Sequence, residues 1–188
     1  VGTADVKIVE CDTLAGTYTD WATGAFTQVA NNGMTTSPAL TIATTLQNVA
    51  NGAFTFYIGT TAYTKAAVVV GTVLNADTIP QNKYGAMAFD INSIGTITVV
   101  SALGNAAGYN TAALAIAGIP AHAATLARMG TVTAMNAAAT FIFGTTALTT
   151  GTVAYTSALD VTDSTIYEKA YTGSKKYIKT VAKVLETA

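Results

Sequence analysis

The chain has 188 residues, of which 51% are apolar and only 10% are charged, and its formal net charge is −1. This composition excludes a disordered chain, which needs low hydrophobicity and high net charge, and a nucleic-acid binder that depends on a basic surface. The single cysteine, Cys11, excludes a disulfide framework and a multi-cysteine metal site.

No segment predicts a membrane-spanning helix, although the mean hydropathy is +0.42. Thr, Gly or Asn interrupts every apolar stretch before the roughly 18 residues that a spanning helix needs. The first ten residues contain Asp5, Lys7 and Glu10 and lack the apolar region of a signal peptide. We therefore expect neither a membrane nor a nucleic acid as partner.

The charged residues are distributed unevenly, and none occurs in residues 21–64, 91–127 or 129–159. The surface of a small soluble monomer carries about 25–35% charged residues. Either much of this surface is buried against neighbouring subunits, where charges are depleted, or it is neutral and rich in Thr. The first interpretation is favoured, and it predicts a homo-oligomer.

The first half of the chain predicts short strands, because Thr, Val, Ile, Tyr and Phe fill its regular segments and Gly, Asn and Asp separate them. Residues 5–10, 18–21 and 25–29 are predicted strands. Residues 53–58 and 63–70 predict a β-hairpin that turns at 59–61. Residues 84–91 and 96–101 predict a second hairpin that turns at 92–95.

The second half predicts one short helix at 110–118, with Asn110 or Thr111 as its cap and Gly118 at its end. Residues 121–128 predict a second helical turn. Further strands are expected at 131–135, 140–143, 152–156, 165–170 and 176–184; the last could also form a helix, but the context favours a strand. About a dozen strands and one helix predict an all-β fold of sandwich or barrel type.

The two ends of the chain carry recognisable residue patterns, at 5–29 (DVKIVECDTLAGTYTDWATGAFTQV) and at 164–184 (STIYEKAYTGSKKYIKTVAKV). The first resembles the opening strands of small structural proteins of tailed bacteriophages, and the second resembles the end of the same proteins. In that family a turn leads into the final strand that closes the domain. The matching residues here are Tyr171, Gly173, Lys175, Lys176 and Tyr177.

The middle of the chain is similar to another phage virion segment. The similarity is carried by Ile79-Pro80, Lys83-Tyr84-Gly85, residues 95–99, Pro120 and Arg128-Met129-Gly130. The first pattern is therefore split, with the second between its halves. This order predicts a discontinuous β base domain, residues 1–31 plus 158–188, and an inserted β-rich domain, residues 32–157, that carries the short helix.

The resemblance implies a non-enzymatic virion protein, an auxiliary head protein that decorates or cements the capsid. Its partner would be the major capsid protein, trimers would be the favoured oligomer, and the protein would lie on the head surface after assembly in the host cytoplasm. The family offers no catalytic residues to transfer, and we expect no cofactor and no metal. The alternatives are a subunit of an extracellular filament or surface layer, with an exchanged N-terminal strand, and a phage tail or fibre protein.

Few residues could support catalysis. His122 is the only histidine, and its sequence neighbours include no carboxylate that could make it a general base. Cys11 stands between Glu10 and Asp12, whose charges oppose a reactive thiolate. Glu10, Asp12 and Asp20 could hold calcium, although turn acids are the simpler interpretation. The Gly-containing run at 104–108 predicts a β-turn and lacks the Lys-Ser/Thr of a phosphate loop.

The C-terminal segment holds five of the nine basic residues. They would form an electrostatic foot that docks on an acidic capsid surface, where charge complementarity sets register and association rate. The competing interpretation is a solvated strand face balanced by nearby acids. The candidate docking residues are Lys169, Lys175, Lys176, Lys179, Lys183, Tyr171 and Tyr177.

Overall fold

The computed structural model describes residues 4–11, 19–22, 27–28, 32–59, 61–158, 167–168 and 177–184, with side chains in 32–59 and 61–158. The chain divides into two compact units. Unit 1 comprises Val1–Gln28 and Tyr167–Ala188, and unit 2 comprises Val29–Ile166. The domain boundaries predicted from the sequence were 31/32 and 157/158.

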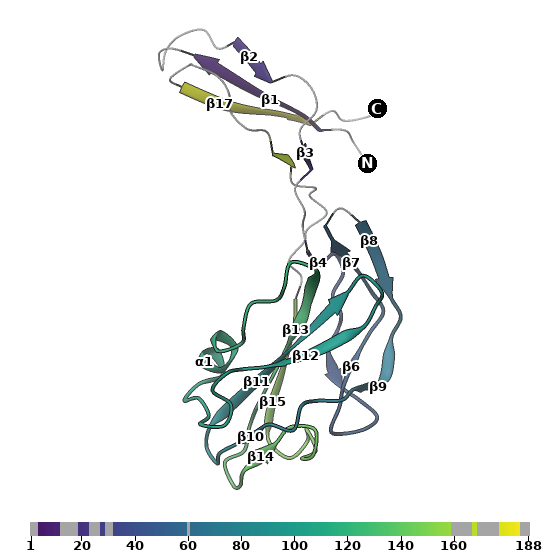
Figure 1. Cartoon of the computed structure of the whole chain (residues 1–188), viewed down its shortest axis with the longest axis vertical. Helices are drawn as coiled ribbons and strands as arrows, with labels where there is room; N and C mark the ends of the chain where they lie inside the picture. The colour runs from purple at the N-terminus through teal and green to yellow at the C-terminus, as the bar shows by residue number, and fades with distance from the viewer. Residues whose placement is uncertain are drawn as a thin grey trace. The chain divides into compact units, whose positions relative to one another are not determined.

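Unit 1 is built from both ends of the chain (Figure 1). Its three-stranded antiparallel sheet has the order β17-β1-β2, formed by Tyr177–Val184, Ala4–Cys11 and Thr19–Ala22. A second pair joins β3 (Thr27–Gln28) to β16 (Tyr167–Glu168). The predicted strand at the end of the chain is confirmed.

Unit 2 has a central four-stranded antiparallel sheet of order β12-β11-β13-β15. Its strands are β11 (Tyr84–Asn92), β12 (Ile97–Ser101), β13 (Leu126–Met135) and β15 (Thr152–Ser157). Two three-stranded sheets accompany it. The first contains β4 (Gly33–Met34), β7 (Phe54–Ile58) and β8 (Thr61–Lys65), and the second contains β5 (Thr41–Ile42), β6 (Val49–Asn51) and β9 (Val68–Thr72). A small pair joins β10 (Thr78–Ile79) to β14 (Phe141–Ile142).

The core of unit 2 lies between these sheets. Side chains from β11 and β13 pack in one apolar cluster with side chains from β4, β6, β7, β10 and β14; its largest buried members are Phe56, Phe89, Phe141, Phe143, Met34, Ile79 and Met87. Alternate residues of β11 point to opposite faces of a strand. Met87, Phe89 and Ile91 enter this cluster, whereas Ala86 packs in a second cluster with Ala102 and with Ala115 of α1 (Ala112–Ala117). The central sheet is therefore covered on both faces.

Sequence reasoning predicted several of these elements and missed others. The all-β class, the two hairpins β7–β8 and β11–β12, and the helix are confirmed. The helical turn predicted at residues 121–128 is wrong, because β13 begins at Leu126. The expected strand at 63–70 is two strands in different sheets, β8 and β9, and the described residues contain 17 strands instead of about a dozen.

The helix is held at its start by a side-chain cap. Thr111 has an extended backbone, and its Oγ1 accepts a hydrogen bond from Leu114 N at 3.2 Å. Thr111→Ala is expected to lower the free energy of unfolding by about 1 kcal/mol, because the cap bond is lost. Urea unfolding followed by far-UV circular dichroism measures this change. Thr111→Ser keeps the hydroxyl and is expected to retain wild-type stability; equal losses in both variants would contradict the capping role.

Candidate functional site

The candidate docking residues belong to unit 1, and the described ones lie on β17. This strand pairs with β1 over eight successive positions, which places Tyr177 opposite Cys11, Lys179 opposite Val9 and Lys183 opposite Asp5. The first and last strands of the chain thus form one ladder. Lys169, Tyr171, Lys175 and Lys176 lie outside the described residues.

The two units differ in their content of charged residues. Unit 1 has 50 residues and contains 12 of the 19 charged residues of the chain, including six of the nine basic ones. Unit 2 has 138 residues and contains the other seven. The fraction of charged residues in unit 1 is that of an ordinary protein surface, whereas unit 2 has few charged residues of either sign.

A buried ion pair lies on the face of the central sheet opposite the main core. Arg128 Nε is 2.9 Å from Asp90 Oδ1, and Arg128 Nη2 donates to Asp90 Oδ2 at 3.1 Å. Nη2 also donates to the carbonyl oxygen of Pro120 at 2.9 Å, which attaches the segment before β13 to the sheet. Asp90 is 1% exposed and the Arg128 side chain is 19% exposed, so the carboxylate is enclosed in the fold while the guanidinium reaches toward the surface.

A break in strand register places the two charges opposite each other. β11 and β13 pair in one register from Tyr84↔Met135 to Phe89↔Gly130, and in a shifted register from Asp90↔Arg128 onward. The extra residue, Met129, forms a β-bulge, which redirects side chains locally. Without it, Asp90 would face Met129. The bulge therefore creates the ion pair.

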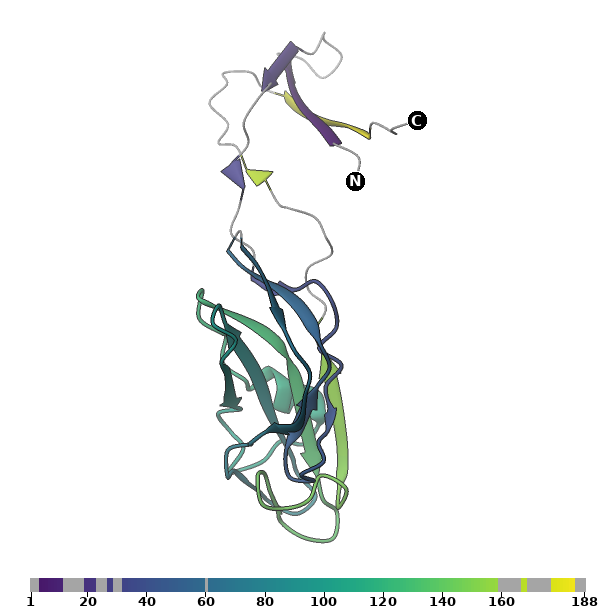
Figure 2. The same cartoon turned by 90° about the vertical axis from the view of Figure 1, so that its right-hand side faces the viewer.

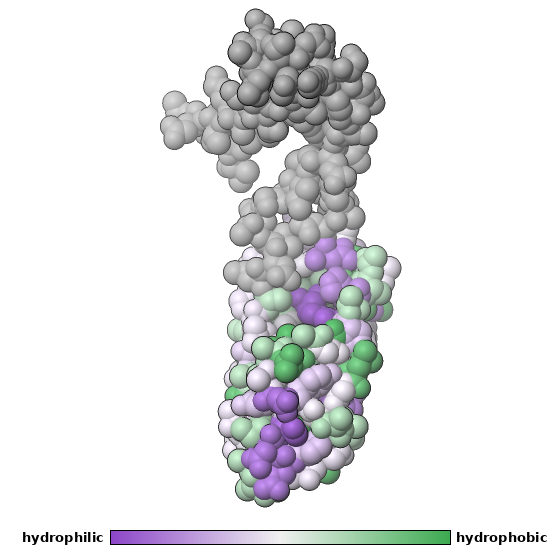
Figure 3. Space-filling model, turned by 90° about the vertical axis from the view of Figure 1, so that its left-hand side faces the viewer, coloured by the Kyte–Doolittle hydropathy of each residue, from purple (hydrophilic) through white to green (hydrophobic). Residues whose placement is uncertain are grey.

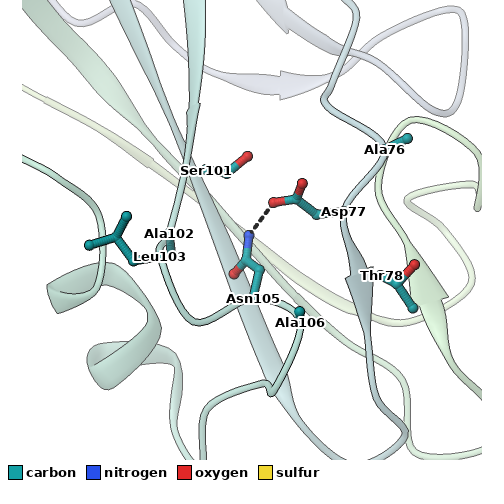
Figure 4. A pocket seen from close by; sticks show the side chains of 8 residues that line it. All are labelled: Ala76, Asp77, Thr78, Ser101, Ala102, Leu103, Asn105 and Ala106. Atoms are coloured by element: carbon teal, nitrogen blue, oxygen red, sulfur yellow. Dashed lines mark hydrogen bonds between the residues drawn. The ribbon is translucent and has the colours of Figure 1, made fainter.

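An open hollow of about 470 Å³ lies beside β12 (Figure 4). Its polar centre is a hydrogen bond of 2.7 Å from Asn105 Nδ2 to Asp77 Oδ2. Asn105 is buried, and it also binds both backbone groups of Ala86, accepting from its N at 3.0 Å and donating to its O at 2.9 Å. These hydrogen bonds connect the segments that carry Asp77 and Asn105 to β11, so the polar side chains of the hollow contribute to holding the fold together.

The other residues considered for chemistry are not brought together. His122 is half-buried, and its Nδ1 lies 3.1 Å from the carbonyl oxygen of its neighbour Ala123. Glu10 and Asp20 lie on the paired strands β1 and β2, and Asp12 lies outside the described residues. Within the described residues no three His, Cys, Asp or Glu side chains converge on a possible metal position.

The ion pair could have been inferred from the sequence. Asp90 and Arg128 are the two charges that bound the uncharged run 91–127. Charges that stand alone in an apolar strand are rarely buried unless they are paired, so each was the other's natural partner. Asn105 had no comparable signal, since its segment has the composition of an ordinary turn.

Comparison with known protein families, curated proteins and solved structures finds no match to this chain. Among the described residues, the helix is far too short to span a membrane. The chain is therefore established as an all-β protein with two compact units.

Proposed function

We propose that the protein is a non-enzymatic structural component of a virion, a capsid decoration protein whose unit 1 binds the major capsid protein. The observation that carries this proposal is the concentration of charge in unit 1, which both chain ends build together. A charged docking unit can select its register on a lattice, and the near-neutral unit 2 takes no part in that contact. Many copies, each making a modest contact, would then stabilise the shell together.

The arrangement of β1 favours this proposal over a filament that grows by strand exchange. Strand exchange needs an N-terminal strand that completes the sheet of a neighbour. In unit 1, β1 has β17 along one edge and β2 along the other. The backbone N–H and C=O groups of β1 are already hydrogen-bonded within its own chain. To complete the sheet of a neighbour, β1 would have to give up its pairing with both β17 and β2.

Cryo-electron microscopy of the particles that contain this protein tests the location. The proposal predicts density for unit 1 on the head lattice, in many copies or at symmetry axes. Density confined to a tail or to a free filament would overturn the proposal and support the alternative positions.

Paired lysine variants of the full chain test the docking surface. Lys179→Gln with Lys183→Gln removes two positive charges from β17 and is expected to weaken binding to heads lacking this protein at least tenfold, because hydrogen bonds to charged groups contribute about 1.5–3 kcal/mol each. Lys65→Gln with Lys83→Gln removes two positive charges from unit 2 and serves as the matched control. Co-sedimentation at two salt concentrations measures both pairs. Equal binding by the two pairs would remove β17 from the docking surface.

A further inference from the structure

The strand register of unit 1 determines which of its residues share a face of the sheet. β1 and β17 pair at eight successive positions without a shift, and Figures 1 and 2 both show the two strands side by side. Residues directly opposite each other in an antiparallel pair belong to the same face, and successive residues of a strand alternate between faces. The register therefore assigns every residue of β1 and β17 to one of two faces.

One face of this sheet is charged and the other is apolar. Five of the six charged residues in β1, β2 and β17 belong to the first, here called the lysine face; they are Asp5, Lys7, Asp20, Lys179 and Lys183. Glu10 belongs to the second face. Six of the eight residues that β1 and β17 contribute to the second face are apolar, namely Ala4, Val6, Ile8, Ile178, Ala182 and Val184. This division is typical of an antiparallel sheet with one buried and one solvated face, so we expect the lysine face to be the solvated one.

Lys7 is the central member of a group of three lysines. Its direct partner on β17 is Val181, and the residues two positions before and after Val181 are Lys179 and Lys183. Both lysines are therefore diagonal neighbours of Lys7, and diagonal neighbours in a sheet lie about 7–8 Å apart, within reach of long side chains. The ladder thus adds a lysine from the opposite end of the chain to the basic residues of the C-terminal segment.

The acidic residues of the lysine face offset only part of its positive charge. Asp5 is directly opposite Lys183, a position at which opposite charges attract each other. Lys7 and Lys179 are each directly opposite a valine of the partner strand. Lys7 and Lys179 therefore carry the charges of this ladder that no directly opposing acid offsets.

The charged side chains of unit 2 form no such group within the part that the structure describes. Each of the five is engaged within the protein: Asp90 pairs with Arg128, Asp77 accepts from Asn105, Lys65 donates to Gly95 O, and Lys83 donates to Asn110 Oδ1. On the face of unit 2 visible in Figure 3, hydrophilic and hydrophobic residues lie next to each other. The lysines of unit 2 are therefore suitable controls for those of the lysine face.

We propose that Lys7 and Lys179 bind carboxylate groups of the major capsid protein. This inference rests on the proposed function and adds the chemistry of the contact. Neighbouring like charges in a sheet repel each other, and an acidic partner replaces this repulsion with charge-assisted hydrogen bonds. Asp5 and Asp20 on the same face oppose an extended polyanion such as a nucleic acid, whose binding needs a continuously basic surface. Individual carboxylates placed opposite the two lysines fit this mixed face better.

Single variants of the full chain test the two lysines. Lys7→Gln and Lys179→Gln are each expected to weaken binding to heads lacking this protein about tenfold or more, because each removes a charged hydrogen-bond donor. Lys183→Gln is expected to weaken binding no more than about threefold, since Asp5 already offsets its charge. Lys65→Gln removes the same charge from unit 2 and should bind as the wild type does. Co-sedimentation at low salt measures all four variants.

Removal of one acid from each face tests which face binds. Asp5→Asn leaves Lys183 without its opposing charge and is expected to strengthen binding about threefold. Glu10→Gln removes one negative charge from the same strand on the other face, and it is the matched control, with binding expected at the wild-type level. Equal gains in the two variants would show that only net charge matters and would overturn the proposal.

The stability of unit 1 distinguishes a docking residue from a structural one. Lys7→Gln reduces the repulsion among the three lysines, so unit 1 is expected to be at least as stable as in the wild type. Thermal unfolding followed by the fluorescence of Trp21, which belongs to unit 1, measures this stability. Weaker binding together with lower stability would assign Lys7 a structural role and overturn the inference.

The binding measurements also separate this inference from the proposed function. Wild-type protein that does not bind heads would overturn the proposed function and the inference with it. Wild-type protein that binds, with Lys7→Gln equal to Lys65→Gln, would overturn the inference alone and leave the capsid as partner.

Discussion

Gly130→Ala is expected to lower the free energy of unfolding of unit 2 by about 4 kcal/mol or more, a size reserved for severe core defects. A Cβ atom on Gly130 would lie 2.2 Å from the carbonyl oxygen of Thr156 and 3.0 Å from Ser157 Cα. These are backbone atoms of β15, which cannot retreat without breaking its ladder with β13. In addition, Gly130 has φ of +150°, a conformation that residues with a side chain rarely adopt.

Gly59→Ala separates the steric clash from the backbone strain. Gly59 has φ of +61°, and no atom lies within 4 Å of the place that a Cβ would occupy, so alanine there should cost only about 1–2 kcal/mol. Urea unfolding followed by far-UV circular dichroism compares the two variants. Fluorescence is unsuitable, because the only tryptophan, Trp21, belongs to unit 1. If Gly130→Ala lowered the free energy of unfolding no more than Gly59→Ala does, the backbone of β15 would have moved away from the added methyl group, contrary to this prediction.

Arg128→Met is expected to destabilise unit 2 by about 3–5 kcal/mol, because it leaves the carboxylate of Asp90 buried without its partner. The substitution also releases the carbonyl oxygen of Pro120, so the segment before β13 loses its attachment to the sheet. The free energy of unfolding from urea titration measures the total effect.

The double variant Asp90→Asn with Arg128→Met tests the electrostatic cause. Removing both charges eliminates the unpaired buried carboxylate, so the double variant should recover part of the stability that Arg128→Met loses. Lys83→Met is the matched control, because its exposed contact with Asn110 should contribute no more than about 1 kcal/mol. If the double variant were no more stable than Arg128→Met, packing around Arg128 would explain the loss.

Local pattern predicted the elements whose partners are close in sequence. The hairpin β11–β12 follows from two strand-forming runs and a turn in which Gly95 N donates to Asn92 O at 3.0 Å. The helix follows from its Thr cap and its run of Ala and Leu. Both depend on neighbours within a few residues, which sequence reasoning can evaluate.

Elements defined by distant partners were missed or misjudged. Residues 121–128 have the composition of a helical turn, yet Leu126 begins β13 because Asn92 of β11 pairs with it. The two-residue strand β4 exists only because Met34 pairs with Phe56 of β7. The exposure of Leu114 and Ile116 was also beyond prediction, since both look like core residues until the helix orientation is known.

The short pair β3–β16 makes unit 1 a natural insertion site. Gln28 pairs with Tyr167 and Thr27 with Glu168, so the chain leaves unit 1 and returns to it on neighbouring strands, about 5 Å apart. A tight turn could bridge the same gap, and so could any domain whose own ends lie close together, as domain ends commonly do. Unit 2 can thus be regarded as an insertion in unit 1. A single recombination event could replace or delete it and leave the pairing between the first and last strands intact.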